Sequence, residues 1–264
     1  TDFYNQAVKG TKEVKEVKPE VKLEEKPIPK ELEPLAEEAK KYKSAEEFVK
    51  AQPIVYHGTA GKFDTFDDKM TGSVTGAKSA HGATWFTDDK DVAKAYSIYA
   101  AESGPINKLQ RQADELDKIA RKSGKESDWE KYNKVVEEME KLDTYDANFK
   151  RRELANVKEA VLDGDFYKVN AKGKSPQELS ADGDIDSWLS LQVKKAKDLK
   201  KDGLIIENID DAVGLYNKPS THYAIFDTSK IKTKSQLTEI WNKAHKEVKP
   251  EVKPEIKEPP KESE

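Results

Sequence analysis

Both ends of the chain consist largely of Lys, Glu and Pro, and this composition confines the folded part to the middle of the sequence. The two segments run from about Lys9 to Leu35 and from about Lys246 to Glu264. They carry too few apolar side chains to offset the entropy lost on ordering, and proline keeps such segments extended. We therefore expect a disordered linker with one short helix over residues 1–43, a folded domain over residues 44–245, and a second disordered linker over residues 246–264.

The charge balance argues against a protein that binds polyanions. Lys and Arg total 47 against 51 Asp and Glu, which gives a net charge of -4. A chain without a basic field has no electrostatic means of holding nucleic acid or an anionic membrane. No run of about eighteen apolar residues and no signal-peptide pattern is readable. We expect neither nucleic acid nor a membrane as partner, and a cytoplasmic location.

Several chemistries have no basis in the sequence. The absence of cysteine excludes disulfides, thiolate nucleophiles and thiolate metal sites. The four histidines lie far apart, and no His-Glu-x-x-His, Gly-x-Gly-x-x-Gly or Walker sequence is present. The acidic runs Asp163–Asp165 and Asp182–Asp186 lack the ligand series of a calcium loop, so we predict turns and no metal. Ser/His/Asp catalysis is compatible with the composition, although no nucleophile-elbow sequence accompanies the histidines.

The folded part begins with a strand, a loop, a second strand and a helix. Apolar residues predict strands at Ile54–Tyr56 and Thr84–Phe86, joined through a Gly-, Ser- and Thr-rich loop. An aspartate that can cap the chain and apolar residues at helical spacing predict a helix over Asp88–Ala101. Ahead of this unit, Pro34–Lys50 predicts a short helix in which Ser44 caps a second turn.

A long, highly charged helical hairpin is predicted from residue 105 to about residue 156, with a break near Ser123-Gly124. Apolar residues at helical spacing form a stripe on each arm. We favour a hairpin that packs on itself, and a partner-binding arm is the alternative. The stripes are Leu109, Ala113, Leu116 and Ile119 on the first arm, and Trp129, Tyr132, Val136, Met139 and Leu142 on the second.

Short strands alternate with one more helix in the rest of the domain, which indicates a mixed α+β core with a helical insertion. The predicted elements are strands at Val157–Leu162 and Phe166–Val169, a helix at Ile185–Lys200, and strands at Gly203–Asn208 and Tyr223–Asp227.

Three short blocks follow one another along this domain. They are Tyr56-His57-Gly58-Thr59, then Gly82-Ala83-Thr84-Trp85-Phe86-Thr87 followed by Tyr96, and finally His222-Tyr223-Ala224-Ile225-Phe226-Asp227. The blocks resemble the ADP-ribosyltransferase superfamily, in the diphtheria-toxin and poly-ADP-ribose-polymerase branch that carries a histidine, a tyrosine and usually a glutamate. The likeness is strongest to such domains in phage and mobile-element polyvalent proteins and in phage toxin-like proteins. It covers most of residues 53–233 apart from the hairpin, and it implies a split, mixed or antiparallel sheet with NAD in the cleft.

In that family nicotinamide departs from C1 of its ribose and leaves an oxocarbenium-like sugar, which a nucleophile traps. The protein then needs mainly to orient the dinucleotide and to stabilise charge on the ribose. The resemblance implies that Tyr96 stacks on one face of the nicotinamide ring and Trp85 on the other, where stacking adds roughly 0.5–1.5 kcal/mol.

The resemblance also assigns polar roles. His57 would bond a ribose hydroxyl, and Thr59 would brace the turn behind it. Gly58 would leave its backbone amide and carbonyl open to the nicotinamide carboxamide. The hydroxyl of Thr87 would steady the pocket.

His222 stands where the family usually carries glutamate. That glutamate accepts a hydrogen bond from the ribose 2′-hydroxyl and places negative charge near the developing cation, whereas neutral imidazole supplies no charge. Losing one such contact costs on the order of 2.7–4 kcal/mol of barrier stabilisation. With His57 and Tyr96, His222 completes the candidate catalytic set, and poly-chain elongation is not expected. Glu207 or Glu102 could approach the pocket and compensate.

We therefore expect an NAD-dependent mono-ADP-ribosyltransferase, of the glycosyltransferase class, that modifies a protein acceptor with reduced activity. The alternative is a catalytically silent NAD-binding or protein-interaction module of a phage or mobile-element polypeptide, in which the hairpin contacts a partner. A structural spacer within a virion polypeptide is a third possibility. The phage resemblance adds a virion-associated location, or delivery into a host cell, to the cytoplasmic expectation.

Overall fold

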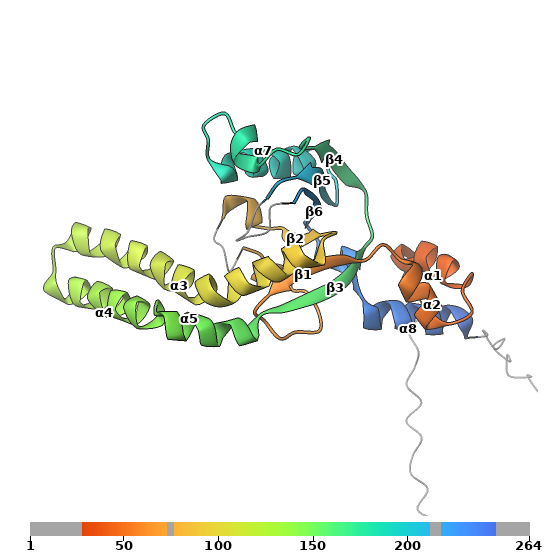
Figure 1. Cartoon of the computed structure of the whole chain (residues 1–264), viewed down its shortest axis with the longest axis horizontal. Coiled ribbons are helices and arrows are strands. Elements are labelled where there is room, and N and C mark those ends of the chain that lie inside the picture. Colours follow the sequence, from red (N-terminus) through yellow and green to blue (C-terminus); the bar gives the residue numbers. More distant parts are fainter. Residues whose placement is uncertain (1–27, 73–76, 212–217, 247–264) are drawn as a thin grey trace, which may run out of the picture.

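The computed structural model describes residues 28–72, 77–211 and 218–246, and these form a mixed α+β fold around one seven-stranded sheet (Figure 1). The strand order is β4-β5-β6-β2-β1-β3-β7, and all neighbours are antiparallel except β4 and β5. The expected linkers lie, for residues 1–27 and 247–264, outside the described residues. The strands are β1 (Val55–Thr59), β2 (Thr84–Thr87), β3 (Asn156–Leu162), β4 (Phe166–Asn170), β5 (Gly203–Ile209), β6 (Ser220–Ile225) and β7 (Ile231–Thr233).

The sheet is narrowly joined between β1 and β2. Strand β1 pairs with β3 along its whole length, from Val55 to Thr59, but its register with β2 is limited to Tyr56 opposite Thr87. The strands β4-β5-β6-β2 and β1-β3-β7 therefore form two parts that separate beyond Tyr56. His57 lies on the stretch of β1 that has left β2.

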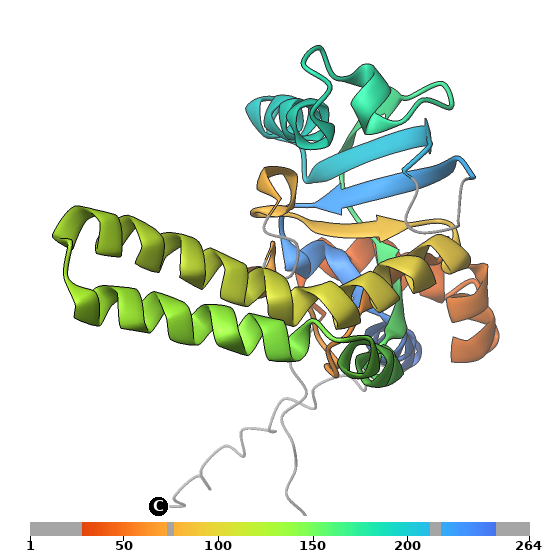
Figure 2. The ribbon, with the colours of Figure 1, turned by 60° about the vertical axis from the view of Figure 1, so that its left-hand side comes forward.

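Helices cover the two parts of the sheet separately. Helix α7 (Ile185–Asp198) packs on the β4-β5-β6 part, where Leu189 and Val193 join Leu204 and Ile206 in one buried cluster. Helix α3 (Lys90–Ser123) lies against β1, at the junction of the two parts (Figure 2). The remaining helical segments are α6 (Pro176–Leu179), η2 (Asp68–Met70), η3 (Lys78–Ala80), η4 (Arg152–Leu154) and η5 (Thr228–Lys230).

The helix predicted over residues 88–101 and the first hairpin arm are one continuous helix, α3, so the predicted separation between residues 101 and 105 is wrong. A proline inside a helix removes one backbone hydrogen bond and strains the preceding turn. Contacts next to this turn help to hold the helix, since the guanidinium of Arg151 donates to the carbonyl of Glu102 at 3.2 Å. The break near Ser123-Gly124 is confirmed, because Gly124 ends α3 at φ 65°.

The return arm comprises α4 (Glu126–Leu142) and α5 (Tyr145–Arg151), and the hairpin projects from the sheet in both views (Figures 1 and 2). Its seam includes Ala113 and Ala120 of α3, which are 2% and 0% exposed, and buried Val135 of α4. The predicted place of Ile119 in this seam is wrong, because Ile119 is 50% exposed. Small side chains allow two helices to approach closely. Ala120 lies seven residues, about two helical turns, after Ala113, so both alanines are on the same side of α3. No helix in the described ranges, α3 included, is long and apolar enough to cross a membrane.

The short helix predicted over residues 34–50 is two helices, α1 (Glu33–Ala39), preceded by η1 (Lys30–Leu32), and α2 (Ala45–Ala51). The cap by Ser44 is confirmed, as its Oγ accepts from the amide of Glu47 at 3.1 Å. Both helices pack on α8 (Lys234–His245), which the sequence reading missed. Ordered packing therefore begins near residue 30 rather than at residue 44. The buried contacts of this bundle come from Ala36, Ala39, Phe48, Val49, Val161, Leu237 and Ile240.

Candidate functional site

A cavity of about 830 Å³ lies where β1 separates from β2. Its volume falls within the roughly 300–1,000 Å³ of small-molecule sites. Strands β1, β2 and β6 and helix α3 all contribute to its wall. Every site residue expected from the sequence lines it: His57, Gly58, Thr59, Trp85, Thr87, Tyr96 and His222.

His57 presents a neutral imidazole with a defined tautomer. Its Nδ1 lies 2.7 Å from the carbonyl oxygen of Trp85, which can only accept, so Nδ1 carries the proton. The ring packs against Phe66 and Phe86, each at 5.4 Å between centroids. Burial lowers the pKa of His57, and the bond to Trp85 opposes this shift only in part. The neutral ring retains Nε2 as an acceptor for a hydroxyl group.

Gly58 allows α3 to lie directly on β1. A Cβ at this position would be 2.0 Å from the carbonyl oxygen of Ala93 and 2.6 Å from the amide nitrogen of Ser97. These are backbone atoms of the helix that carries Tyr96, so any side chain at residue 58 would displace that helix. The next residue, Thr59, accepts from the amide of Gly61 through Oγ1 at 3.0 Å and so holds the turn after β1.

Aromatic side chains make up much of the cavity wall. The indole nitrogen of Trp85 donates to the carbonyl oxygen of Ser79 at 3.2 Å, which ties its ring to the loop before β2. The ring of Tyr96 meets that of His222 edge-on, with centroids 6.2 Å apart. Such a wall suits a flat, apolar-faced ligand group. Its aromatic members are Tyr56, Phe63, Phe66, Trp85, Phe86, Tyr96 and Tyr99.

Asp211 joins Tyr96 and His222 into one polar cluster. The hydroxyl of Tyr96 donates to Oδ2 of Asp211 at 2.5 Å, and the same oxygen lies 3.4 Å from Nδ1 of His222. Burial, followed by the charge of Asp211, raises the pKa of Tyr96 well above its usual value. Tyr96 therefore remains a protonated donor, oriented by the carboxylate.

His222 is held through both ring nitrogens. It is 4% exposed, and its Nε2 lies 3.0 Å from Oγ of Ser220 while Nδ1 faces Asp211. Because a carboxylate oxygen only accepts, the proton belongs on Nδ1, and the Ser220 hydroxyl donates to Nε2. Burial lowers the pKa of His222, against the opposing charges of Asp211 and Asp88. The neutral ring thus has both nitrogens engaged within the protein.

Ser220, His222 and Asp211 share the composition of a Ser/His/Asp triad but not its exposure. A nucleophilic serine of that type stands on a sharp turn that presents its hydroxyl. Ser220 instead begins strand β6 and is 8% exposed. Its hydroxyl also accepts from Thr87 Oγ1 at 3.4 Å. We interpret Ser220, His222 and Asp211 as a chain of polar contacts that fixes the orientation of the His222 ring.

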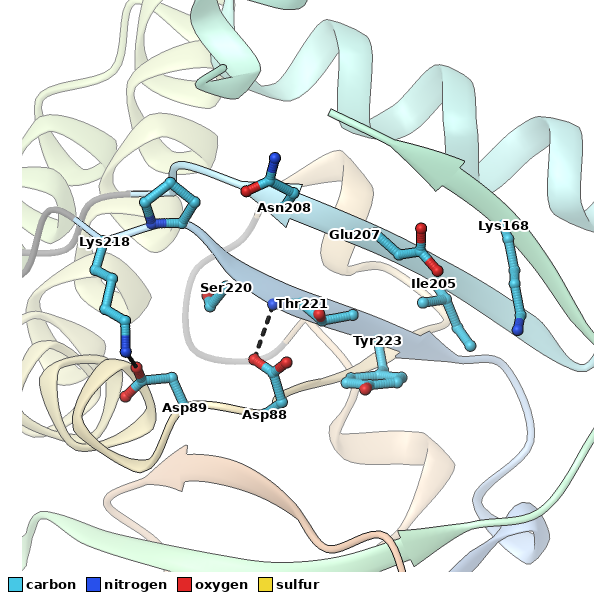
Figure 3. Close-up of a pocket in the computed structure, with 11 residues that line it drawn as sticks. Asp88, Asp89, Lys168, Ile205, Glu207, Asn208, Lys218, Ser220, Thr221 and Tyr223 are labelled. Atoms are coloured by element: carbon cyan, nitrogen blue, oxygen red, sulfur yellow. Dashed lines mark hydrogen bonds and ion pairs between the residues drawn. The ribbon is translucent and has the colours of Figure 1, made fainter. Parts of the chain in front are cut away.

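Neither glutamate considered from the sequence lines this cavity. Alternate residues of a strand face opposite sides, and Ile206 lies beside His222, so Glu207 faces the other side of the sheet. There it borders a separate depression of about 620 Å³ with Ile205 and Tyr223 (Figure 3). Glu102 pairs with Arg152 near the base of the hairpin.

An irregularity in β5 places Asp211 beside His222. Ile206 is opposite His222 and Ile209 is opposite Ser220, so β5 holds one more residue than β6 between these pairs. Asn208 absorbs the extra residue at φ 53°. Such a bulge shifts the alternation of the side chains that follow. Asp211 was not predicted as a site residue, and the only signal was a pair of aspartates, Asp210 and Asp211, shortly after the strand predicted to end at Asn208.

Acidic side chains outnumber basic ones around the cavity. Among the described lining residues Lys62 is the one lysine, and arginine is absent. The aspartates are Asp67, Asp184, Asp186 and Asp211. Within the described ranges no group of three or more His, Asp or Glu side chains is arranged to hold a metal ion.

Comparisons of this chain with protein-family models, with curated proteins and with solved structures find no match. We therefore infer the function from the residues of the cavity and their geometry.

Proposed function

We propose that the protein binds NAD in the cavity between β1 and β2 and transfers ADP-ribose to a protein acceptor. The observation that supports this most is the meeting of His57, Tyr96 and His222 in the wall of one cavity. In the reaction the bond between ribose C1 and the nicotinamide nitrogen breaks, and its electron pair leaves with nicotinamide. A nucleophile of the acceptor forms the new bond to C1 and loses its proton.

The site geometry suits the nicotinamide end of the dinucleotide. Trp85 and Tyr96 offer aromatic surfaces to the pyridinium ring, and stacking contributes roughly 0.5–1.5 kcal/mol beyond burial. The acceptor nitrogen of neutral His57 can take a hydrogen bond from a ribose hydroxyl. The acidic lining favours the cationic ring and the sugar cation that forms as it departs.

The same charges give the pyrophosphate little attraction. With Lys62 as the one described cation of the lining, affinity comes from the nicotinamide and its ribose. Salt weakens binding by screening exposed charge pairs, and this cavity offers the pyrophosphate few cations to pair with. We therefore expect the NAD dissociation constant to change little between low and physiological ionic strength. Calorimetric titration at both salt concentrations measures this, and a steep weakening with salt would contradict the assignment.

A catalytically silent NAD-binding or protein-interaction module is the second candidate. It is favoured by one observation, that both ring nitrogens of His222 are engaged within the protein. Residue 222 therefore offers the ribose neither charge nor a free acceptor. In this candidate the projecting hairpin of α3 and α4 contacts the partner, as part of a larger phage or mobile-element polypeptide.

Incubation with labelled NAD and a cell lysate distinguishes the two candidates. Transfer predicts label on protein that is lost in Tyr96→Ala and kept in Tyr145→Ala, a control whose tyrosine is 78% exposed and lies outside the cavity. Saturable NAD binding without release of nicotinamide supports the silent module. An absence of NAD binding would overturn both.

A further inference from the structure

We propose that Asp211 supplies the carboxylate of this site, with its Oδ1 accepting a hydrogen bond from a hydroxyl of the nicotinamide ribose. The inference rests on the proposed function and names the group that performs the task expected of residue 222. It gives His222 the role of a positioning residue.

The two oxygens of Asp211 are used differently. Tyr96 Oη, at 2.5 Å, and His222 Nδ1, at 3.4 Å, both address Oδ2. Within the described part of the chain, no hydrogen bond or ion pair reaches Oδ1. The side chain is 21% exposed and lines the cavity, so a ligand can approach the second oxygen.

The groups around Asp211 hold it in place without neutralising it. Tyr96 donates from a hydroxyl that burial keeps protonated, and the His222 ring is kept neutral by its own burial. Neither partner carries a positive charge, so neither cancels a negative charge on the Asp211 carboxylate. A Lys or Arg in either position would have cancelled it.

The chemistry of the step requires such a charge. As the bond from C1 to nicotinamide breaks, the electron pair leaves with the ring and positive charge develops on the ribose. An ionised carboxylate bonded to a ribose hydroxyl stabilises that charge more in the transition state than in the ground state, which is the condition for accelerating the reaction. The acceptor nucleophile then bonds to C1, and the proton it releases passes to solvent.

Asp211→Asn preserves the size of the side chain and removes its charge. We expect the kcat for nicotinamide release to fall by about 100- to 1,000-fold, as for the loss of other preorganised transition-state contacts, with little change in NAD affinity. Asp64→Asn is the matched control, since it removes the same charge from an exposed loop residue outside the lining. Asp211→Ala offers a second variant, in which added formate should restore part of the rate by returning a carboxylate to the vacated space.

Proton NMR titration of the histidines supplies a readout that does not depend on turnover. The groups facing His222 are Asp211, Asp88, Tyr96 and Ser220, and the charge of Asp211 opposes the lowering of the His222 pKa by burial. Asp211→Asn should therefore lower the pKa of His222 further, whereas Asp64→Asn should leave it unchanged.

The outcomes separate the inference from the function. Wild-type turnover in Asp211→Asn, or no formate rescue in Asp211→Ala, overturns the role of Asp211 while ADP-ribosyl transfer stands. If the wild-type protein does not bind NAD, the proposed function and the ribose contact both fall. The titration then still decides whether Asp211 adjoins His222, because an unchanged His222 pKa would refute the cluster itself.

Discussion

Replacing Gly58 by alanine tests whether the direct contact of α3 with β1 maintains the site. The added Cβ would lie 2.0 Å from the carbonyl oxygen of Ala93, while real Cβ contacts essentially never fall under 3.0 Å. Helix and strand must therefore separate by about 1 Å at this point, because overlapping atoms of that kind repel steeply. The atoms that must move belong to the helix backbone, so no side-chain rotation can relieve the overlap.

The expected cost lies at the upper end of overpacking, about 3 kcal/mol. For a folded region of this size, that corresponds to a fall in Tm of roughly 6–12 °C. The displacement would also move Tyr96, which is three residues along α3 from Ala93. A misplacement of about 1 Å can reduce turnover by about 100-fold. Thermal unfolding followed by circular dichroism measures the first effect, and nicotinamide release measures the second.

Gly61→Ala is the matched control for the change at Gly58. There the nearest atom to an added Cβ is a ring carbon of Phe63 at 3.2 Å, which can yield by a small rotation. We expect its unfolding free energy to change by less than about 1 kcal/mol. Equal Tm values for the two variants would refute the close contact of α3 with β1.

Three further predictions follow from burial and backbone geometry. Burial lowers the pKa of His57, so the unfolded chain binds the proton at a higher pH than the folded protein does. The free energy of unfolding should therefore drop as pH falls below about 6.5. Urea unfolding should show a smaller drop in His57→Gln, and an equal drop would contradict this. Ala120→Leu should destabilise the hairpin by about 1–3 kcal/mol, whereas Ile119→Ala, at a 50% exposed site, should be nearly neutral in the same assay. Asn208→Val should disfavour the positive φ of the bulge and turn Asp211 away from His222, which NMR would detect as a lower His222 pKa. Asn208→Gly should preserve the bulge and the His222 pKa. Identical His222 pKa values in the two variants would refute the role of the bulge.

The strands of the sheet were predictable because their signals are local. Short apolar runs ending at Gly, Asp or Asn mark strands β1 to β6 at positions that differ from the structure by a few residues at most. The differences reach three residues at the end of β1, which is Thr59 rather than Tyr56, and at the start of β6, which is Ser220 rather than Tyr223. Polar Ser220 and His222 are buried there by neighbouring strands, and an apolar pattern does not reveal such residues.

Tertiary contacts decided the features that the sequence did not reveal. Pro105 indicates a helix end by local rules, yet α3 continues because the return arm packs along it. Helix α8 had a readable signal, a capping box between Thr233 and Gln236, but its apolar face is short and is buried only by packing on α1, α2 and Val161 of β3. The seam of the hairpin follows the seven-residue step to Ala120, since the packing of two helices rather than hydrophobicity selects which residue is buried.

Asp211 shows why the chemistry of a site can exceed its motif. A motif records the residue at one position of β6, but a side chain just after the neighbouring strand can approach that position when a bulge shifts the alternation of β5 by one residue. The extra residue at Asn208 makes this shift, and it leaves Glu207 facing the opposite side of the sheet. The absence of a carboxylate at residue 222 therefore does not leave the cavity without one, because Asp211 also lines it. The charge comes from the segment that follows β5, and the imidazole at residue 222 helps to hold it.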